Sequence, residues 1–131
     1  MDDPDPHHST RINVRNNLIG YFETASSSDL QREYERKVPI AQVPVEMIVQ
    51  WEDWVNHSDL DWYCEPVFSR DERDAIEAFH EVWRGVAQDV PDPMPYTVEQ
   101  LIGTPVWQRL MDAAGVAREV FVRRGRFDDV T

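Results

Sequence analysis

The chain has 131 residues, enough for one domain that buries about two-thirds of its unfolded surface in a single core. Its 13 Lys and Arg residues stand against 25 Asp and Glu residues, which gives a formal net charge of −12. A charge of this sign disfavours direct contact with nucleic acid or with an anionic membrane surface. We expect a cytoplasmic protein, because Cys64 is the only cysteine and no signal peptide or apolar span is recognisable.

The N-terminal segment predicts an acidic tail followed by a helix. We expect residues 1–8 to be a disordered tail because they hold almost no apolar side chain, and residues 9–131 to form one helical domain. From Val14 to Ala25, apolar residues recur at spacings of three and four, which predicts the first amphipathic helix. Gly20 is the expected weak point of that helix.

A second helix is predicted from residue 28 to about Lys37. Ser28 and Gln31 have the spacing of a capping box, and Pro39 ends the helix. Its expected apolar stripe is Leu30, Tyr34 and Val38.

A third helix is predicted after Pro44, a residue suited to the first turn, and it should fade by Asn56. Its expected apolar stripe is Val45, Ile48, Trp51, and Trp54 or Val55. Residues 56–68 show no sustained period, and we interpret them as a long loop.

The fourth helix, at residues 70–88, has the clearest start signal in the chain. Ser69 and Glu72 form a capping-box pair, and acidic residues in the first turn favour the helix dipole. The expected buried stripe is Ile76, Phe79, Trp83 and Val86, and the acidic face opposite is Asp74, Glu77 and Glu81.

The C-terminal third predicts a connector, a short helical turn and a last long helix. Residues 89–95 are expected to be extended because three prolines occur in five positions, and a short helical turn should cover 97–103. Thr104 and Pro105 begin a last helix that Gly125 should end. No segment has the alternation of a strand, so we predict an all-α, single-domain bundle of four longer helices plus one short helix.

The chain has no constellation typical of a catalytic or metal site. Glu77 and His80 have the spacing of a di-iron ligand pair, but a second such pair is missing, so we interpret them as residues at the flank of the helix. The mixed run from His57 to Glu65 fits neither a zinc nor a calcium pattern, and Cys64 lacks the flanking signature of a nucleophile. We therefore predict a protein that is not an enzyme and has no cofactor.

The acidic residues are concentrated in the middle of the chain. Between Glu46 and Glu99 there are 14 acidic and three basic residues. The end of the chain is basic, with four arginines that suit the C-terminal helix dipole, namely Arg118, Arg123, Arg124 and Arg126. An acidic surface of this kind favours rapid, salt-sensitive capture of a basic partner.

Two aromatic residues stand among carboxylates in the predicted loop. Trp62 and Tyr63 lie between Asp61 and Glu65, a composition typical of an interface anchor with a polar rim. The alternative is a loop folded back so that Trp62 covers the core. On the first interpretation, the partner-binding residues are Glu52, Asp53, Asp59, Asp61, Trp62, Tyr63, Glu65, Asp71 and Asp74.

The acidic, aromatic-bearing stretches at 51–54 and 61–63, with the helix start at 69–72, resemble in type those of bacterial toxin-immunity proteins. Such proteins include small acidic helical inhibitors that neutralise basic nuclease toxins in the producing cell. The resemblance implies an inhibitor that binds a basic toxin domain. The arginine-rich end departs from a uniformly acidic inhibitor.

Three other functions remain open at this point. A DNA mimic would place carboxylates in two extended rows at phosphate-like spacing, whereas an immunity protein needs one compact patch. A small metal-binding or enzymatic bundle would use His57, His80 and the central carboxylates. A structural or assembly subunit would present a large apolar face on the first or last helix.

Overall fold

The computed structural model describes residues 6–55 and 60–128, and every regular element within them is helical. The α-helices are α1 (His8–Ala25), α2 (Ser28–Lys37), α3 (Val43–Trp54), α4 (Arg70–Asp89) and α5 (Pro105–Val122). Two 3₁₀ turns, η1 (Leu60–Trp62) and η2 (Val98–Gln100), lie in the connections. The all-α prediction is confirmed, and the description of four longer helices plus one short helix is approximate, because the five α-helices have from 10 to 20 residues.

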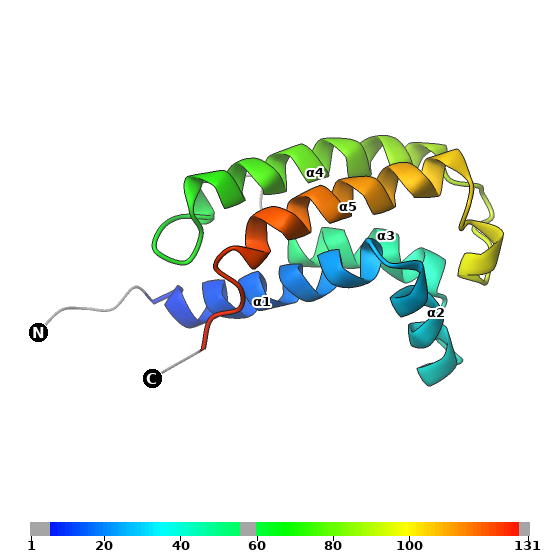
Figure 1. Cartoon of the computed structure of the whole chain (residues 1–131), viewed down its shortest axis with the longest axis horizontal. Helices are drawn as coiled ribbons and strands as arrows, with labels where there is room; N and C mark the ends of the chain where they lie inside the picture. The colour runs from blue at the N-terminus through cyan, green and yellow to red at the C-terminus, as the bar shows by residue number, and fades with distance from the viewer. Residues whose placement is uncertain (1–5, 56–59, 129–131) are drawn as a thin grey trace, which may run out of the picture.

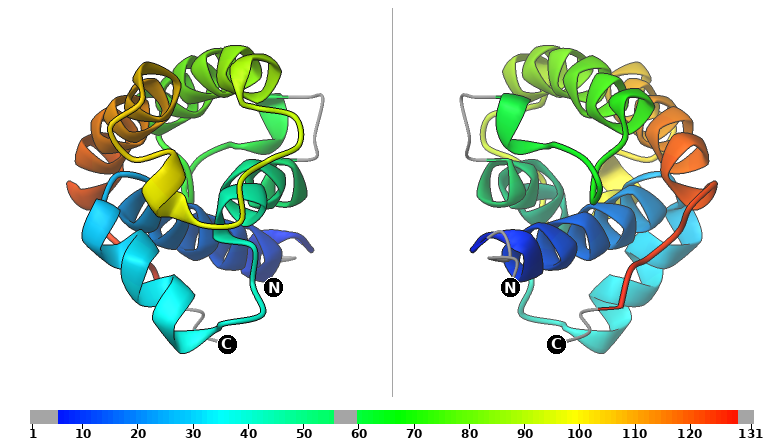
Figure 2. Two further views of the ribbon diagram at one scale, coloured as in Figure 1. Left: turned by 90° about the vertical axis from the view of Figure 1, so that its right-hand side faces the viewer. Right: turned by 90° about the vertical axis from the view of Figure 1, so that its left-hand side faces the viewer.

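The long helices form two layers. α4 and α5 run side by side above α1 and α3, and α2 projects from one end of this body (Figure 1). Viewed end-on, these four helices surround the space that the core side chains fill (Figure 2). Residues near both ends of the described chain, at the start of α1 and after α5, lie at the same end of the molecule.

Aromatic rings from different helices meet at the centre of the core. Phe79 of α4 lies 4.5 Å from the ring of Trp51 in α3 and 5.2 Å from Phe22 in α1. Phe121 of α5 lies 5.6 Å from Phe22. Each of these four side chains is at most 2% exposed. Edge-on and tilted contacts of this kind add to the burial energy, so the four long helices are held by one shared cluster.

Helix starts follow the predicted cap signals in α4 and α5, but not in α2. The Ser69 hydroxyl accepts from the Glu72 N–H, and the Glu72 carboxylate accepts from the Ser69 N–H, which completes the predicted capping box. Thr104 caps α5 in the same way, with a proline in the first turn. In α2, the cap is Ser27 rather than Ser28, because Ser27 accepts from the Leu30 N–H.

The domain boundaries differ slightly from those predicted. α1 begins at His8, inside the segment expected to be a tail, and residues 1–5 of that tail lie outside the described residues. α5 ends at Val122, and Gly125 adopts a φ of 72°, the left-handed conformation that glycine tolerates at the end of a helix. None of the described helices combines the length and the apolar character that crossing a membrane requires.

Candidate functional site

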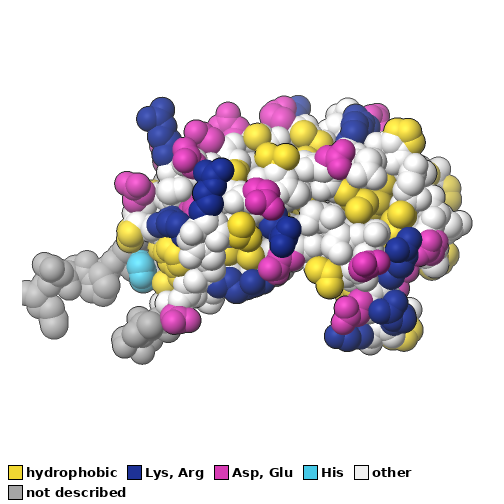
Figure 3. All heavy atoms as spheres, in the orientation of Figure 1, with side chains coloured by type: hydrophobic (Ala, Val, Ile, Leu, Met, Phe, Trp, Pro, Cys, Tyr) yellow, Lys and Arg dark blue, Asp and Glu magenta, His cyan; other side chains and the backbone are white. Residues whose placement is uncertain are grey.

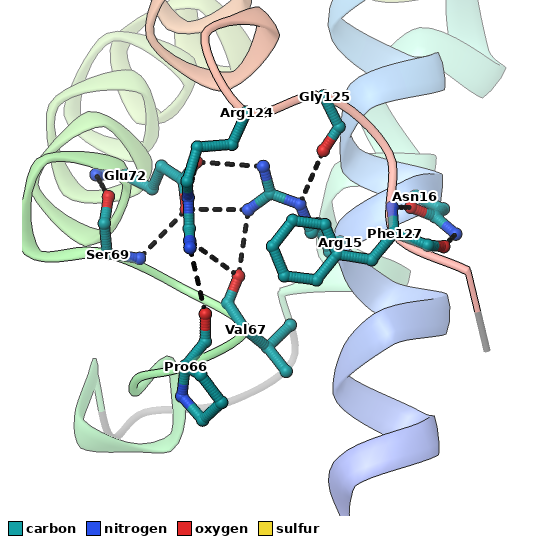
Figure 4. Close-up of polar contacts among 9 residues, drawn as sticks. All are labelled: Arg15, Asn16, Pro66, Val67, Ser69, Glu72, Arg124, Gly125 and Phe127. Atoms are coloured by element: carbon teal, nitrogen blue, oxygen red, sulfur yellow. Dashed lines mark hydrogen bonds and ion pairs between the residues drawn. The ribbon is translucent and has the colours of Figure 1, made fainter. Parts of the chain in front are cut away.

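The buried carboxylate of Glu72 binds two arginines, the buried Arg15 and the partly exposed Arg124. Glu72 is 1% exposed and accepts hydrogen bonds from Arg15 at 2.6 and 2.9 Å and from Arg124 at 2.6 and 3.2 Å (Figure 4). Both arginines also donate to the carbonyl of Val67, at 2.9 and 3.0 Å. The ring of Phe127 lies 4.2 Å from the guanidinium of Arg15. This network joins α1, the start of α4 and the segment that follows α5.

The hydrogen bonds keep Glu72 ionised. Burial alone raises the pKa of a carboxyl group, but the donors from Arg15, Arg124 and the Ser69 N–H outweigh burial and lower this pKa to about 2. Arg126 makes a second attachment by donating to Glu23 at 2.6 Å, a bond that lowers the pKa of that carboxyl. Two of the four arginines at the end of the chain are therefore paired with carboxylates on other helices.

The segment with Trp62 and Tyr63 folds against the core. Tyr63 is 1% exposed and packs edge-on against Phe68 at 5.1 Å, and burial raises its pKa to about 12. Trp62 is half-buried, with its carbonyl accepting from Arg11 and its ring 5.1 Å from that guanidinium. This placement corrects the expectation that Tyr63 offers contact area to a partner, because its ring is enclosed by the protein itself. The alternative of a loop folded back onto the core describes this segment better.

The carboxylates of this segment lie close to arginines of the same chain. Asp61 is exposed and forms an ion pair with Arg73 at 3.5 Å. Glu65 is exposed, and its charge contributes to raising the pKa of Arg124. Asp59 lies outside the described residues. Asp61 and Glu65 therefore offer a partner less unbalanced charge than their number in the sequence indicates.

The other predicted acidic residues are exposed on α3 and α4. Glu52 and Asp53 lie at the end of α3, and Asp71 and Asp74 lie in the first turns of α4. Within residues 6–55 and 60–128, none of these four carboxylates has an ion-pair partner. Their charge is therefore available to solvent or to another molecule.

α4 presents a row of carboxylates that we name the acidic ridge, formed by Asp74, Glu77 and Glu81. Spacings of three and four residues place the three side chains on one face of the helix, and all three are exposed. Glu81 pairs with Arg84 at 3.1 Å. Arg73 lies four residues before Glu77 but pairs with Asp61 instead, and Glu77 has no ion-pair partner in the part of the chain that the structure describes.

Beside the acidic ridge, the end of α3 and the middle of α4 enclose an open hollow of about 380 Å³, which we name the α3–α4 hollow. Trp51 donates from its indole N–H to Nδ1 of His80 at 3.1 Å, and the His80 ring stacks on Trp83 at 5.5 Å. Trp83 in turn donates to the Ile48 carbonyl at 3.0 Å. The full lining is Trp51, Glu52, Asp53, Val55, His80 and Trp83.

These contacts hold the side chains of Trp51, His80 and Trp83 in defined positions within the fold. Because Nδ1 of His80 accepts a hydrogen bond, the neutral ring carries its proton on Nε2. Trp51 and Trp83 are 0% and 7% exposed, so the aromatic ring that the hollow leaves partly accessible is the imidazole of His80. It lies beside the exposed carboxylates of Glu52 and Asp53. A surface of this composition suits a cationic or amide-bearing side chain, which can pair with a carboxylate and stack on an aromatic face.

Metal-ligating side chains do not gather in the described residues: no group of three or more His, Cys, Asp or Glu side chains is placed to hold an ion there. Of the predicted flank pair, Glu77 is exposed, whereas His80 is partly buried through its contact with Trp51. His57 lies outside the described residues. Cys64 is a free, partly buried thiol.

The chain matches no protein-family model, no curated protein and no solved structure.

Sequence reasoning missed the α3–α4 hollow for an identifiable reason. Trp51 and His80 are 29 residues apart, and each was assigned to its own helix without a partner. The available signal was chemical: a buried tryptophan needs an acceptor for its N–H, and a histidine at the flank of a helix can supply one. Which acceptor it is depends on how α3 and α4 pack.

Proposed function

We propose that the protein is a non-catalytic inhibitor that captures a basic partner protein, in the manner of an immunity protein that neutralises a basic toxin in the reducing interior of the producing cell. The single observation that carries the proposal is the imbalance of charge on the surface of α3 and α4. Five exposed carboxylates have no ion-pair partner within the described chain, namely Glu52, Asp53, Asp71, Asp74 and Glu77.

The protein's own cations are largely unavailable to balance those charges. Within residues 6–55 and 60–128, eight arginines form ion pairs with carboxylates of that part of the chain. Glu72 pairs with two of them, the buried Arg15 and the partly exposed Arg124. The acidic surface of α3 and α4 therefore keeps a negative potential that attracts a basic protein and repels nucleic acid.

Capture would proceed in two physical steps. The acidic ridge steers a basic partner toward this face, which raises the association rate at low salt. The α3–α4 hollow then receives a side chain of the partner beside the His80 imidazole and the carboxylates of Glu52 and Asp53, which slows dissociation. Neither step needs a reaction at a catalytic group.

The arrangement favours a protein-binding inhibitor over a DNA mimic. Asp74, Glu77 and Glu81 form one helical row, and Glu52 and Asp53 widen that row across the adjacent hollow. One compact patch with an aromatic depression fits a protein surface better than it fits a groove shaped for two phosphate strands.

Co-expression tests this proposal directly. The protein encoded by the gene next to the one for this chain is produced in cells with and without this chain, and the growth of the cells is measured. Formation of a complex is then measured with the two purified proteins. We expect this chain to relieve growth inhibition and to bind with an association rate that falls steeply as salt rises.

Two variants with equal charge changes localise the effect. One removes four charges from the proposed face, with Glu52→Gln, Asp53→Asn, Asp74→Asn and Glu77→Gln. The control removes four charges elsewhere, with Asp29→Asn, Glu33→Gln, Asp92→Asn and Asp128→Asn. The first should slow association by at least about tenfold and the control by much less. Equal effects of the two variants, or growth inhibition that persists with the unaltered chain, would contradict the proposal.

A further inference from the structure

An apolar groove lies on the other side of the acidic ridge, where α4 and α5 pack against each other. It has a volume of about 200 Å³ and is lined by apolar residues, namely Ala75, Ala78, Phe79, Val82, Ala113, Val116 and Ala117. Figure 3 shows hydrophobic side chains reaching the surface along this line, with acidic side chains beside them. We name it the α4–α5 groove.

The groove exposes apolar side chains at positions where a pair of solvent-facing helices normally carries polar residues. Val116 is 68% exposed, and Ala78 is also exposed. The remaining walls are mostly alanine, so a helix laid along the groove can approach the backbones of α4 and α5 closely. Such a surface fits an amphipathic helix that presents one apolar stripe.

Carboxylates border the groove on both sides. On α4, Asp74 and Glu81 flank Ala78 at spacings of four and three residues. On α5, Asp112 and Glu119 flank Val116 at the same spacings, and both are exposed. The apolar floor therefore has an acidic rim along each of its helices.

Two arginines lie toward the ends of the α5 rim, and a third, Arg118, lies between them. Arg109 donates to Asp89 at 2.6 Å, which ties α5 to the end of α4. Arg123 is exposed at the C-terminal end of α5. Arg118 forms a long ion pair with Glu119 at 3.9 Å, whereas Asp112 has no ion-pair partner among the described residues.

We propose that the α4–α5 groove binds a cationic amphipathic α-helix of the partner protein. The apolar stripe of that helix lies on Ala78 and Val116, and lysine or arginine side chains on its flanks pair with the two acidic rims. The inference rests on the proposed function for the basic character of the partner, and adds the secondary structure it presents and the surface it occupies.

Charge decides between a partner helix and a second copy of this chain. A second copy would bring its own acidic rims, Asp74 and Glu81 with Asp112 and Glu119, against the same residues. Each chain also carries a net charge of −12, so two copies repel each other. A cationic helix is attracted electrostatically by both acidic rims, whereas a second copy of the chain is repelled by them.

A synthetic peptide provides the probe. An 18-residue helical peptide with leucine at positions i, i+3, i+4 and i+7 and lysine on its flanks is titrated into the protein by calorimetry. A peptide of identical composition with the order shuffled, so that it has no apolar stripe, is titrated in parallel. We expect the patterned peptide to bind at least about tenfold more tightly than the shuffled one.

Paired substitutions locate the peptide. The variant Ala78→Gln with Val116→Gln changes two exposed helical positions into a residue that is also favourable in helices, so the fold is retained. The control, Ile40→Gln with Tyr96→Gln, alters two apolar side chains that are 93% and 73% exposed elsewhere. Affinity for the patterned peptide should fall at least about tenfold in the groove variant and stay within about twofold in the control.

Three results would overturn the proposal. The shuffled peptide would bind as tightly as the patterned one, or the groove and control variants would lose affinity equally. The third is a wild-type dimer, detected by sedimentation, that the groove variant dissolves. The peptide assay contains no toxin, so a chain that relieves growth inhibition but fails these tests overturns the groove alone. A chain that passes them but gives no protection contradicts the proposed function instead.

Discussion

At the scale of single residues, the stability of the fold depends strongly on Glu72. The variant Glu72→Gln keeps the size of the side chain but leaves the guanidinium of Arg15, which is 0% exposed, without its counter-charge. Removing one partner of a buried pair costs about 3 to 5 kcal/mol. We expect a loss of this size in the free energy of unfolding, measured by urea denaturation followed by circular dichroism.

Glu77→Gln is the matched control for this substitution. Glu77 lies on the same helix and is exposed without an ion pair in the described chain, so its loss should change stability by less than about 0.5 kcal/mol. Equal stabilities of the two variants would mean that the Arg15 and Glu72 side chains are not paired in solution.

The two aromatics of the folded-back segment should differ in their effect on stability. Tyr63→Ala removes a ring that is 1% exposed and should cost about 4 kcal/mol, whereas Trp62→Ala removes a half-buried ring and should cost about 2 kcal/mol. Thermal or urea unfolding of both variants tests this order. If Trp62→Ala leaves stability unchanged while binding to a partner weakens, Trp62 belongs to the interface, as the sequence first indicated.

At the scale of elements, α2 marks the limit of periodicity arguments. The spacing of Leu30, Tyr34 and Val38 predicted the helix correctly, but it does not mark the buried side, because Leu30 and Val38 are 41% and 40% exposed. Gln31, which is 0% exposed, lies inside instead. Because the ten-residue helix α2 packs through the polar side chain of Gln31, its buried side has no apolar pattern in the sequence. The burial of Gln31 is explained only by the groups that surround it in the fold.

Gln31 joins three helices through its side-chain amide. Its Nε2 donates to the Ala25 carbonyl at the end of α1, and its Oε1 accepts from the Trp107 indole in α5 at 2.9 Å. The variant Gln31→Ala leaves that buried indole N–H without an acceptor and should cost about 2 to 3 kcal/mol.

Arg36→Ala, at an exposed position of the same helix, should change stability by less than about 0.5 kcal/mol. Hydrogen exchange at the end of α1, compared between the two variants, shows whether the loss is local. A stable Gln31→Ala variant with unchanged exchange would contradict the assigned role.

The helices with confirmed starts show what sequence does specify at this scale. Ser69 and Glu72 meet within one turn, so their pairing depends only on residues that are neighbours in sequence. The same carboxylate also binds Arg15 and Arg124, which are 57 and 52 residues away, and no local pattern predicts those contacts. Local signals thus predicted the helix cap, whereas the contacts of Glu72 with the two arginines depend on tertiary packing.

At the scale of the whole molecule, the acidic composition indicated an excess of negative charge, but not where on the surface that charge lies. The arginines of the last turn were expected to act on the dipole of their own helix. Instead, the chain turns back after α5, so that Phe127 exchanges two hydrogen bonds with the Asn16 side chain, at 2.8 and 3.0 Å. In this C-terminal segment, Arg124 pairs with Glu72 and Arg126 pairs with Glu23. The two arginines therefore do not offset the charge of the exposed carboxylates on α3 and α4.

The ion pairs of this C-terminal segment predict how the stability of the fold depends on pH. Glu72 has a pKa of about 2 in the folded protein against 4.5 for the free group, so its contribution is fully present above pH 4.5. That contribution is lost as the pH falls from 4.5 toward 2, because the unfolded chain then binds a proton that the folded chain does not. Glu23, whose pKa is also lowered by its bond with Arg126, loses its contribution in the same direction.

The expected size of this loss follows from the shift in the Glu72 pKa. A difference of this extent corresponds to a loss on the order of 3 kcal/mol between pH 4.5 and pH 2. Urea midpoints measured across this range should fall steeply for the wild type and for Glu77→Gln, and less steeply for Glu72→Gln. The carboxyl resonance of Glu72, followed by NMR in the wild type, should titrate well below that of an exposed glutamate. A Glu72 that titrates near 4.5, with parallel slopes for all three proteins, would mean that the charged network does not hold the end of the chain against α1 and α4.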